Sequence, residues 1–502
     1  MLNRPYFQQC SQNVRRIMLA SAGMAALAAP GGGALAEDGE AINALEQRVD
    51  TIEAKLDAIL SRLEAQDGAG AQLTATETAS LKEAGALIAG REMYDPISIG
   101  APVQRYPDAR IQPILFETDT PGGVSAQETE PPKKSDALKF SAGNADFTFK
   151  GFVKLDATVT DFSAGDLPSS SIGRDFYIPG LIPVGGVGDG PDFDFNPRET
   201  RFIFAVDTDR GGHDIGGLIE LDFQVTSDGN ERVSNSFTPR MRQAYVTIDN
   251  WLIGQAWSTF QDVGALPDNL DFIGPAEGTV FIRQPMIRYT RGPWQIAVEQ
   301  PETEVTGPEG QRLLPGDDVA PDVVVRYNHK RSWGNLALAG IARAIHIEDD
   351  IIPGAVSDTA LGYGVSASGK IKVGKRDDLR FMATYGDGIG RYIGVNIVND
   401  AAITAEGELS TIRTLSGFAS YRHFWTPKLR SNLTGGYFVA DNPVTLTGGG
   451  VTDEVFSVHA NLIYTPIDKV DVGVEYIFAR RTLENGLNGE MNRVQFSTKY
   501  SF

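Results

Sequence analysis

Basic side chains recur at alternating positions within short apolar segments of the chain. In "TRFIFAVD", Phe202 and Phe204 share one face and Arg201 lies on the other. A guanidinium group donates two parallel hydrogen bonds to a carboxylate, so a wall lined with arginine would attract small organic anions. Strand parity predicts one polar, inward-facing set of cations: Arg201, Arg242, Arg288, Arg326, Arg380, Arg493 and Lys499.

Two alternatives stay open for these cations. Each could be an ordinary polar wall residue neutralised by a nearby acid, for which the candidates are Glu199, Glu220, Asp222 and Glu475. Arg242 has a further alternative, because a β-bulge in "PRMRQAYV" would reverse its direction.

Catalytic chemistry has little support in the sequence. The five histidines are scattered without metal-ligand spacing, and no G-x-S-x-G motif occurs. The glycine-rich "GVGDGP" lacks a following helix for phosphate binding, and "DGPDFDFN" lacks the spacing of an EF-hand. We therefore expect no enzyme activity, no cofactor and no metal site.

The elements that must position the cations are strands. Sixteen segments alternate with period two, and each has about the 9–11 residues that a tilted membrane strand needs, or is longer. Charges recur in mid-strand, aromatic residues gather near strand ends, and short and long connections alternate, as in outer-membrane barrels. We predict an all-β transmembrane barrel of about sixteen antiparallel strands, at 145–162, 199–208, 214–227, 238–249, 250–258, 280–290, 294–302, 321–329, 333–347, 360–373, 378–386, 409–424, 428–440, 454–465, 470–480 and 490–502.

One connection is long and rich in glycine, proline and aspartate. It spans 259–283 between the fifth and sixth segments. Long loops in compact domains are usually functional. We expect this loop to fold inwards and narrow the lumen, with Asp262, Asp268, Asp271 and Arg283 near the constriction; an external cap or a subunit contact is the alternative.

The N-terminal part divides into three regions. Residues 1–36 have the basic start, apolar middle and A-x-A end of a secretory signal peptide. Residues 37–66 contain an unbroken a/d repeat typical of a periplasmic coiled coil, with core positions Ile42, Leu45, Val49, Ile52, Leu56, Ile59 and Leu63. Isoleucine at d favours a trimerisation helix, although the mixed core does not fix the number of strands, and a solitary amphipathic helix is the alternative. Residues 67–144 are a linker rich in proline, glycine and threonine, before the barrel domain at 145–502.

Net charge excludes one class of partner. The chain carries a formal charge of -20, and removing the leader with its three arginines makes this -23, which argues against nucleic acid. Cys10 lies in the leader, so the mature chain would contain no disulfide.

The segments "FNPRETRFIFAVDT", "RQAYVTI", "LIGQAWSTFQD" and "RQPMIRYT" resemble the DcaP-like trimeric porin family. The resemblance covers about 145–502 and implies homotrimers in the bacterial outer membrane, a loop folded into each lumen, and passive diffusion of small hydrophilic solutes, often anions such as dicarboxylates. The ending "RVQFSTKYSF", with Tyr500 and Phe502, is similar to the signal that the barrel-assembly machinery reads. The alternative is an envelope-tethering protein that uses its periplasmic coiled coil.

Overall fold

The computed structural model describes residues 137–225, 235–307, 310–316, 318–349, 356–404 and 406–502. The predicted signal peptide and the coiled-coil core positions Ile42, Leu45, Val49, Ile52, Leu56, Ile59 and Leu63 lie outside these residues. No helix within the described residues is long and apolar enough to cross a membrane.

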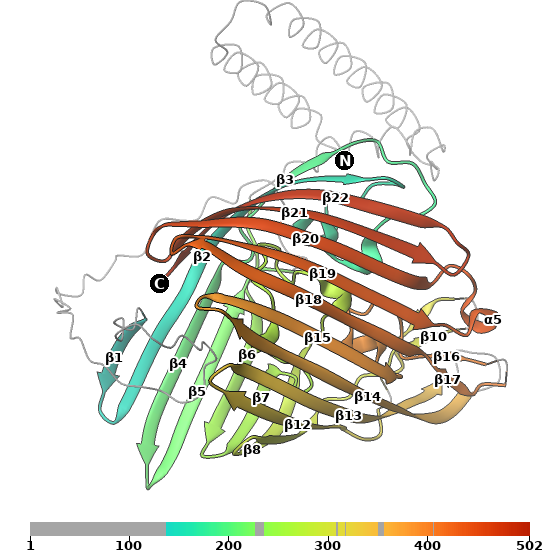
Figure 1. Cartoon of the computed structure of the whole chain (residues 1–502). Coiled ribbons are helices and arrows are strands. Elements are labelled where there is room, and N and C mark those ends of the chain that lie inside the picture. Colours follow the sequence, from blue (N-terminus) through green and yellow to red (C-terminus); the bar gives the residue numbers. More distant parts are fainter. Residues whose placement is uncertain (1–136, 226–234, 308–309, 317, 350–355, 405) are drawn as a thin grey trace, which may run out of the picture. The chain divides into compact units, whose positions relative to one another are not determined.

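The wall is a closed ring of sixteen antiparallel positions (Figure 1). Each wall strand pairs with the next one, except that β3 and β4 both pair with β2, and the last strand returns to the first, from Phe152 opposite Ser501 to Phe162 opposite Met491. This confirms the predicted fold, and every predicted segment overlaps a wall strand. The strands are β2(Ala145–Phe162), β3(Asp192–Asn196), β4(Arg201–Arg210), β5(His213–Asp222), β6(Arg240–Ile248), β7(Trp251–Trp257), β8(Arg283–Arg291), β9(Trp294–Glu299), β12(Asp322–Arg331), β13(Gly334–Asp349), β14(Val356–Val373), β15(Asp377–Asp387), β18(Arg413–Thr426), β19(Leu429–Asp441), β20(Thr452–Ile467), β21(Val470–Leu483) and β22(Asn488–Ser501).

Strand β2 has more partners than the sequence predicts. One of its edges pairs with β4 over 145–152 and with β3 over 156–160, so β3 and β4 share one wall position. Its other edge pairs with β22 over 152–162 and with β1(Leu138–Ala142) over 145–149. The described wall therefore begins at Leu138, inside the region predicted as linker.

Connections are short at one end of the barrel and long at the other. The short turns include 211–212, where Gly211 and Gly212 both have positive φ, as glycine readily allows. The long loops carry the other elements: α4(Ile172–Asp175), η1(Pro179–Leu181), η2(Val263–Ala265), η3(Ala276–Gly278), β10(Val305–Thr306), β11(Arg312–Leu313), η4(Gly390–Tyr392), β16(Ala401–Ile403), β17(Leu409–Thr411) and α5(Val444–Thr447). In outer-membrane barrels the short turns are periplasmic.

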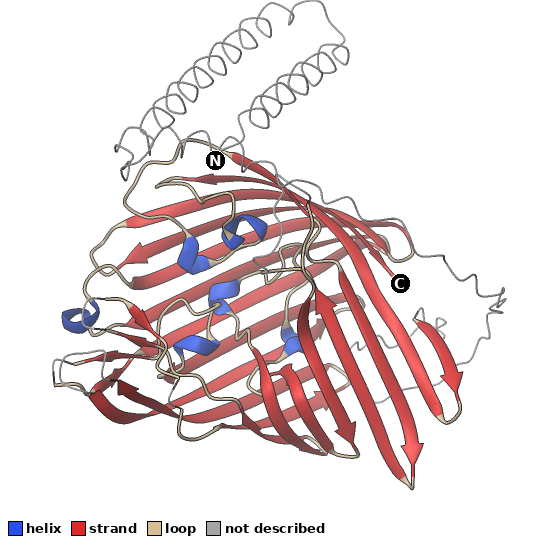
Figure 2. Ribbon diagram, turned by 180° about the vertical axis from the view of Figure 1, so that it is seen from behind, coloured by secondary structure: helices blue, strands red, loops and turns tan. Residues whose placement is uncertain are grey.

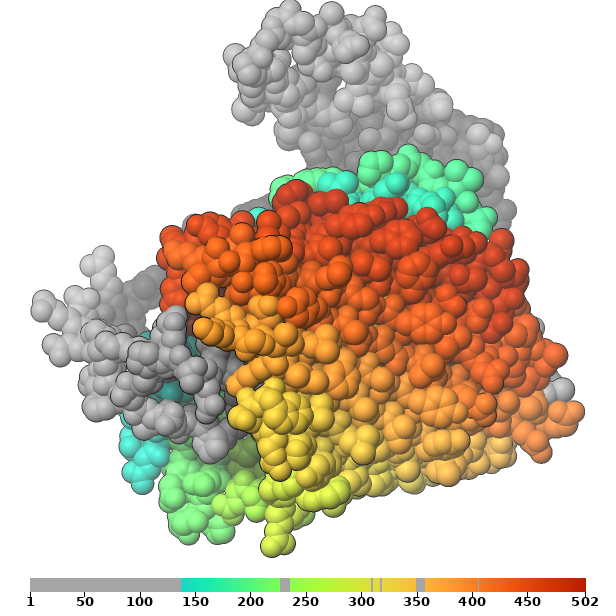
Figure 3. All heavy atoms as spheres, in the orientation of Figure 1, coloured from blue at the N-terminus to red at the C-terminus, as the bar shows by residue number. Residues whose placement is uncertain are grey.

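The two faces of the wall differ in chemistry. On β14, Leu361, Tyr363 and Val365 are exposed, whereas Ser366 and Ser368 are buried on the other face. Apolar residues cover the outer face of the wall, part of which is shown in Figure 3. The inner face carries hydroxyl, amide and charged groups, together with buried apolar residues on which the loops pack. This arrangement suits a barrel with lipid outside and a polar lumen inside.

Candidate functional site: the lumen and its charged wall

A cluster of arginines on β4 to β6 surrounds two buried carboxylates. Asp222 accepts hydrogen bonds from Arg240 Nε at 2.8 Å and from Arg242 Nη1 at 2.7 Å. Glu220 accepts from Arg242 Nε at 2.7 Å and lies 3.2 Å from Arg201 Nη1. A bulge does occur here, because the β5–β6 register shifts after Glu220, and Arg242 is nevertheless held against these inward carboxylates.

Two further arginines on β8 lack a carboxylate partner. Neither Arg283 nor Arg288 forms an ion pair with any residue that the structure describes. The Arg283 guanidinium lies 4.5 Å from the centre of the Trp257 ring, and Arg288 Nη1 donates to the Trp257 carbonyl oxygen at 3.4 Å. On this side of the barrel four guanidinium groups lie near Glu220 and Asp222, and Arg288 interacts with the buried Glu299 of β9, so five cations outnumber these three carboxylates.

The opposite wall repeats this chemistry. Asp378 accepts from Arg380 Nε at 2.7 Å and from Arg422 Nε at 3.0 Å, and it lies 3.8 Å from Lys370 Nζ. The cations are the more accessible partners: the Lys370 side chain is 22% exposed and that of Asp378 is 3% exposed. Arg430 and Lys499 continue the set around Asp471.

The β7–β8 loop (258–282) lies inside the barrel, because it bonds to inward side chains around most of the wall. Asp262 binds Arg326 at 2.8 Å, and Asp268 binds Arg430 at 2.8 Å and Arg422 at 3.2 Å. Its backbone is held at further points on β2, β15, β19 and β21, by Lys154 to Leu270 O, Arg380 to Leu266 O, Asn432 to Asp268 O and Leu270 N to Glu475. Figure 2 shows short loop helices among the strands.

The acids of this loop differ in electrostatic environment. Burial alone would raise the pKa of Asp268, but the charges of Arg430 and Arg422 outweigh it and hold that pKa below its usual range. Burial raises the pKa of Asp271 and of Glu277, despite opposing interactions with Arg493 and His459 respectively. Asp268 is thus a firm anion at neutral pH, whereas the two buried acids hold their protons more tightly.

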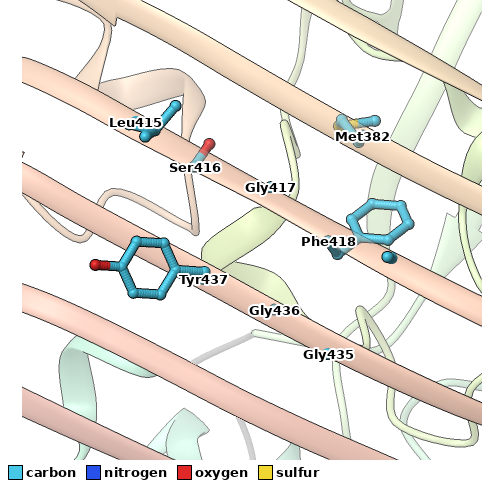
Figure 4. A pocket seen from close by; sticks show the side chains of 9 residues that line it. Met382, Leu415, Ser416, Gly417, Phe418, Gly435, Gly436 and Tyr437 are labelled. Atoms are coloured by element: carbon cyan, nitrogen blue, oxygen red, sulfur yellow. The ribbon is translucent and has the colours of Figure 1, made fainter.

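The tip of the loop presses against wall glycines. Gly436 and Gly417 lie on adjacent strands, β19 and β18 (Figure 4). A Cβ on Gly436 would lie 2.2 Å from Glu277 Oε1, and a Cβ on Gly278 would lie 2.2 Å from the Gly417 carbonyl oxygen. Glycine is needed here because any side chain would push the loop away from the wall.

Two other loops also enter the lumen, which the sequence reasoning missed. The β2–β3 loop (163–191) packs Phe176, Tyr177 and Ile178 against the β7–β8 loop and the inner faces of β21 and β22. The β15–β18 loop (388–412) packs Tyr392 and Ile393 against the other side, and Gly394 N donates to Thr279 O at 3.1 Å. Their runs of apolar residues were the signal, since a solvated external loop has no reason to carry them.

The predicted site residues therefore divide into three groups. Arg201, Arg288, Arg326, Arg380 and Lys499 are partly accessible inside the barrel, and Asp262 and Asp268 lie in the β7–β8 loop against the wall. Arg242 and Arg493 face inwards but are 1% and 0% exposed, so they do not line the open lumen, in contrast to the prediction. Arg283 begins strand β8 instead of lying in the loop, and Asp271 is buried, where it accepts from Tyr177 N at 2.8 Å.

Several cations of the lumen were not predicted. They are Arg240, Lys370, Arg422 and Arg430, together with Lys154, which faces inwards but is buried. Alternation was the available signal for Lys370, Arg422 and Arg430, because each is one strand position from an outward apolar or aromatic residue. The burial of Arg493 could not be predicted from alternation, because a loop far away in the sequence covers this side chain. Arg493 Nη2 donates a hydrogen bond to Gly173 O of that loop at 2.7 Å.

A closed sixteen-stranded barrel with an apolar exterior and a charged lumen defines an outer-membrane channel protein of the porin class. The comparisons agree with this class. A family profile described as DcaP outer membrane protein matches residues 199–502. The chain belongs to this family, and it is a protein of the bacterial outer membrane.

Solved structures show the same fold. The crystal structure of the outer membrane channel DcaP of Acinetobacter baumannii has a TM-score of 0.60 and 24% identity, covering 72% of this chain and 99% of that one. Weaker similarity is found to the anion-selective porin from Comamonas acidovorans (TM-score 0.44, 11% identity, 71% and 100% covered) and to OmpT of Vibrio cholerae (0.43, 9%, 72% and 100%). A search of curated protein sequences found no match.

Proposed function

We propose that the protein is a trimeric porin through which small hydrophilic solutes diffuse passively, with a preference for small organic anions such as dicarboxylates. The observation that supports the preference is the uneven exposure of the paired charges. Asp222 and Asp378 are buried behind the arginines and lysines that face the lumen. A passing solute therefore meets mainly cations, and rings of cationic side chains select anions in pores.

The β7–β8 loop supplies the constriction in this proposal. Asp262 and Asp268 attach it to Arg326, Arg422 and Arg430, so its acids are engaged with the wall. The unpaired Arg283 and Arg288 lie on the strand that follows the loop. Arginine there would bind a carboxylate through two donors while leaving the solute free to exchange.

Assembly is the second part of the proposal. The coiled coil at 37–66 would bring three chains together in the periplasm, and the linker that follows would join it to the barrel. Phe502 exchanges two backbone hydrogen bonds with Gly151, at 3.0 and 3.1 Å, and would be read with Tyr500 by the barrel-assembly machinery. The apolar outer wall is in contact with outer-membrane lipid.

The test of the anion preference is the reversal potential in asymmetric salt. A charge about 8 Å from a passing ion contributes about 0.5 kcal/mol in water, roughly twofold in permeation. Replacing Arg283 and Arg288 by glutamine should lower the anion-to-cation permeability ratio severalfold. The matched variant Arg210→Gln/Arg376→Gln, which removes two cations from exposed turns, should change it less. Cation selectivity in the wild type would refute the preference, and liposome swelling with dicarboxylates, monocarboxylates and sugars would rank the solutes.

A further inference from the structure

The short turns carry charge unevenly around the barrel. The ends of β8 and β12 and the turn that follows β14 hold exposed cations, and we call this set the basic rim. None of its members forms an ion pair with another described residue. Two carboxylates follow Arg376: Asp377 is engaged by His423 Nδ1 at 2.8 Å and by Phe424 N at 3.0 Å, and Asp378 is engaged by Arg380 and Arg422. The basic rim consists of Arg291, Lys330, Arg331, Lys375 and Arg376.

The turns on the other side of the same end are acidic. The β1–β2, β4–β5 and β6–β7 turns and the strand ends beside them carry exposed aspartates, which outnumber the neighbouring cations Lys139, Lys150 and Arg210. The two sides of this end of the barrel therefore differ in the sign of their exposed charge. The aspartates are Asp146, Asp207, Asp209, Asp214 and Asp249.

A band of aromatic side chains fixes the height of the basic rim. Trp294 packs on Tyr327 with ring centres 4.8 Å apart, and His329 lies between Tyr327 and Trp333, with ring centres 6.3 and 6.4 Å away. Trp294 and Trp333 are 51% and 43% exposed on the outside of the wall. Tryptophan and tyrosine collect at the membrane–water boundary, so this band marks the edge of the hydrocarbon.

The two arginines closest to this band point to the lipid side. Arg291 shares the outward face of β8 with Ile287 and Tyr289, and it pairs across the sheet with Trp294. Arg331 follows Tyr327 and His329 on the outward face of β12. Both guanidinium groups therefore leave the wall at the level of the lipid headgroups, where a phosphodiester can accept two hydrogen bonds from each.

We propose that the basic rim binds the headgroups of anionic phospholipids in the periplasmic leaflet, of the phosphatidylglycerol or cardiolipin class. The geometry matches this ligand: fixed cations lie just beyond an aromatic band, on the lipid side of the wall. Juxtamembrane basic residues gain their attraction from the negative surface of a leaflet, and the effect is confined to a Debye length. The acidic aspartates would leave the opposite side of the same end without such lipids.

The experiment compares two charge-matched variants of the full chain. Arg291→Gln/Arg331→Gln/Arg376→Gln removes three cations from the basic rim, and Lys139→Gln/Lys150→Gln/Arg210→Gln removes three from the acidic side. Each purified protein is incubated with mixed micelles of phosphatidylglycerol and phosphatidylcholine, and the retained lipid is counted by native mass spectrometry. We expect retained phosphatidylglycerol to fall about tenfold in the first variant, to stay unchanged in the second, and phosphatidylcholine to be unaffected in both.

Equal retention in the wild type and both variants would overturn the proposal. Heat-modified migration on gels checks that the barrels are folded. If the first variant does not fold, a salt series of the wild type decides: between about 50 and 500 mM the Debye length shortens from about 14 to about 4 Å, so specific retention should decline. Carbodiimide cross-links from Lys330 or Lys375 to protein carboxylates, with lipid retention insensitive to salt, would assign the rim to an acidic protein segment and refute lipid binding.

Discussion

Asp268→Asn tests how the β7–β8 loop is held in the lumen. The carboxylate joins Arg430 at 2.8 Å and Arg422 at 3.2 Å, on two neighbouring strands. The substitution keeps the size of the side chain and removes its charge, while the backbone anchor from Leu270 N to Glu475 at 2.7 Å remains. We expect the loop to stay folded but to leave the wall more often.

The size of the effect follows from the exposure of the partners. Breaking a buried ion pair by removing one partner costs about 3–5 kcal/mol. The side chains of Asp268, Arg422 and Arg430 are 22%, 18% and 14% exposed, so solvent reduces this cost. A loss of about 2 kcal/mol would raise the population of the detached loop about 30-fold. A state populated at about 0.1% would then reach about 3%.

Single-channel recording in planar bilayers measures this directly. Asp268→Asn should add brief excursions in conductance and raise the open-channel noise. The control is Asp471→Asn, which removes an equal charge beside Arg430, at 3.1 Å, from the wall strand β21 and so does not release the loop. Both variants should shift selectivity towards anions by a similar amount. Indistinguishable noise in the two variants, or a quiet Asp268→Asn channel, would refute the tether.

Three further outcomes are expected. Burial raises the pKa of Glu277 above its value in the unfolded chain, so the folded protein retains this proton at pH values between the two pKa values and loses stability as the pH rises through that window. Glu277→Gln should remove the resulting decline in melting temperature. An unchanged pH profile in this variant would contradict the argument. Gly436→Ala should destabilise the barrel by about 1–3 kcal/mol in heat-modified migration, whereas at Gly435 the nearest atom to an added Cβ is 3.9 Å away and alanine should be tolerated. Deleting Phe502, which bonds to Gly151, should lower the yield of folded barrel more than the conductance; an undiminished yield would count against an assembly role.

The wall could be predicted because its determinants are local. Each strand shows its two faces by alternation, and the terminal segment returns to β2 with Val153 opposite Tyr500. The same parity places Arg288 and Arg326 inside the barrel, where their partners are Trp257 O and Asp262. Local sequence patterns were enough wherever a residue's direction depends only on its own strand.

The contents of the lumen could not be predicted in this way, because they depend on contacts between distant segments. Arg493 is covered by the β2–β3 loop, more than three hundred residues earlier in the chain. The loop tip fits against the wall only because Gly278 of the loop and Gly436 of the wall lack side chains, a complementarity that no single segment displays. The direction of the Arg242 side chain was uncertain for a related reason. A bulge changes the alternation of the strand, and the side chain of Arg242 is held in place by Glu220 and Asp222 of the neighbouring strand.

Strand β1 covers an edge of β2 that would otherwise favour aggregation while the barrel is closing. Strand β22 stops opposite Phe152, whereas β2 continues down to Ala145, so the lower edge of β2 has no partner from the C-terminal strand. β1 occupies that place, with Leu138 opposite Phe149 and Phe140 stacked on Phe147 at 4.9 Å. An uncovered edge with outward phenylalanines is a template on which another copy could add a strand. The hairpin of β1 and β2 closes this edge within one chain and thereby opposes aggregation at the seam.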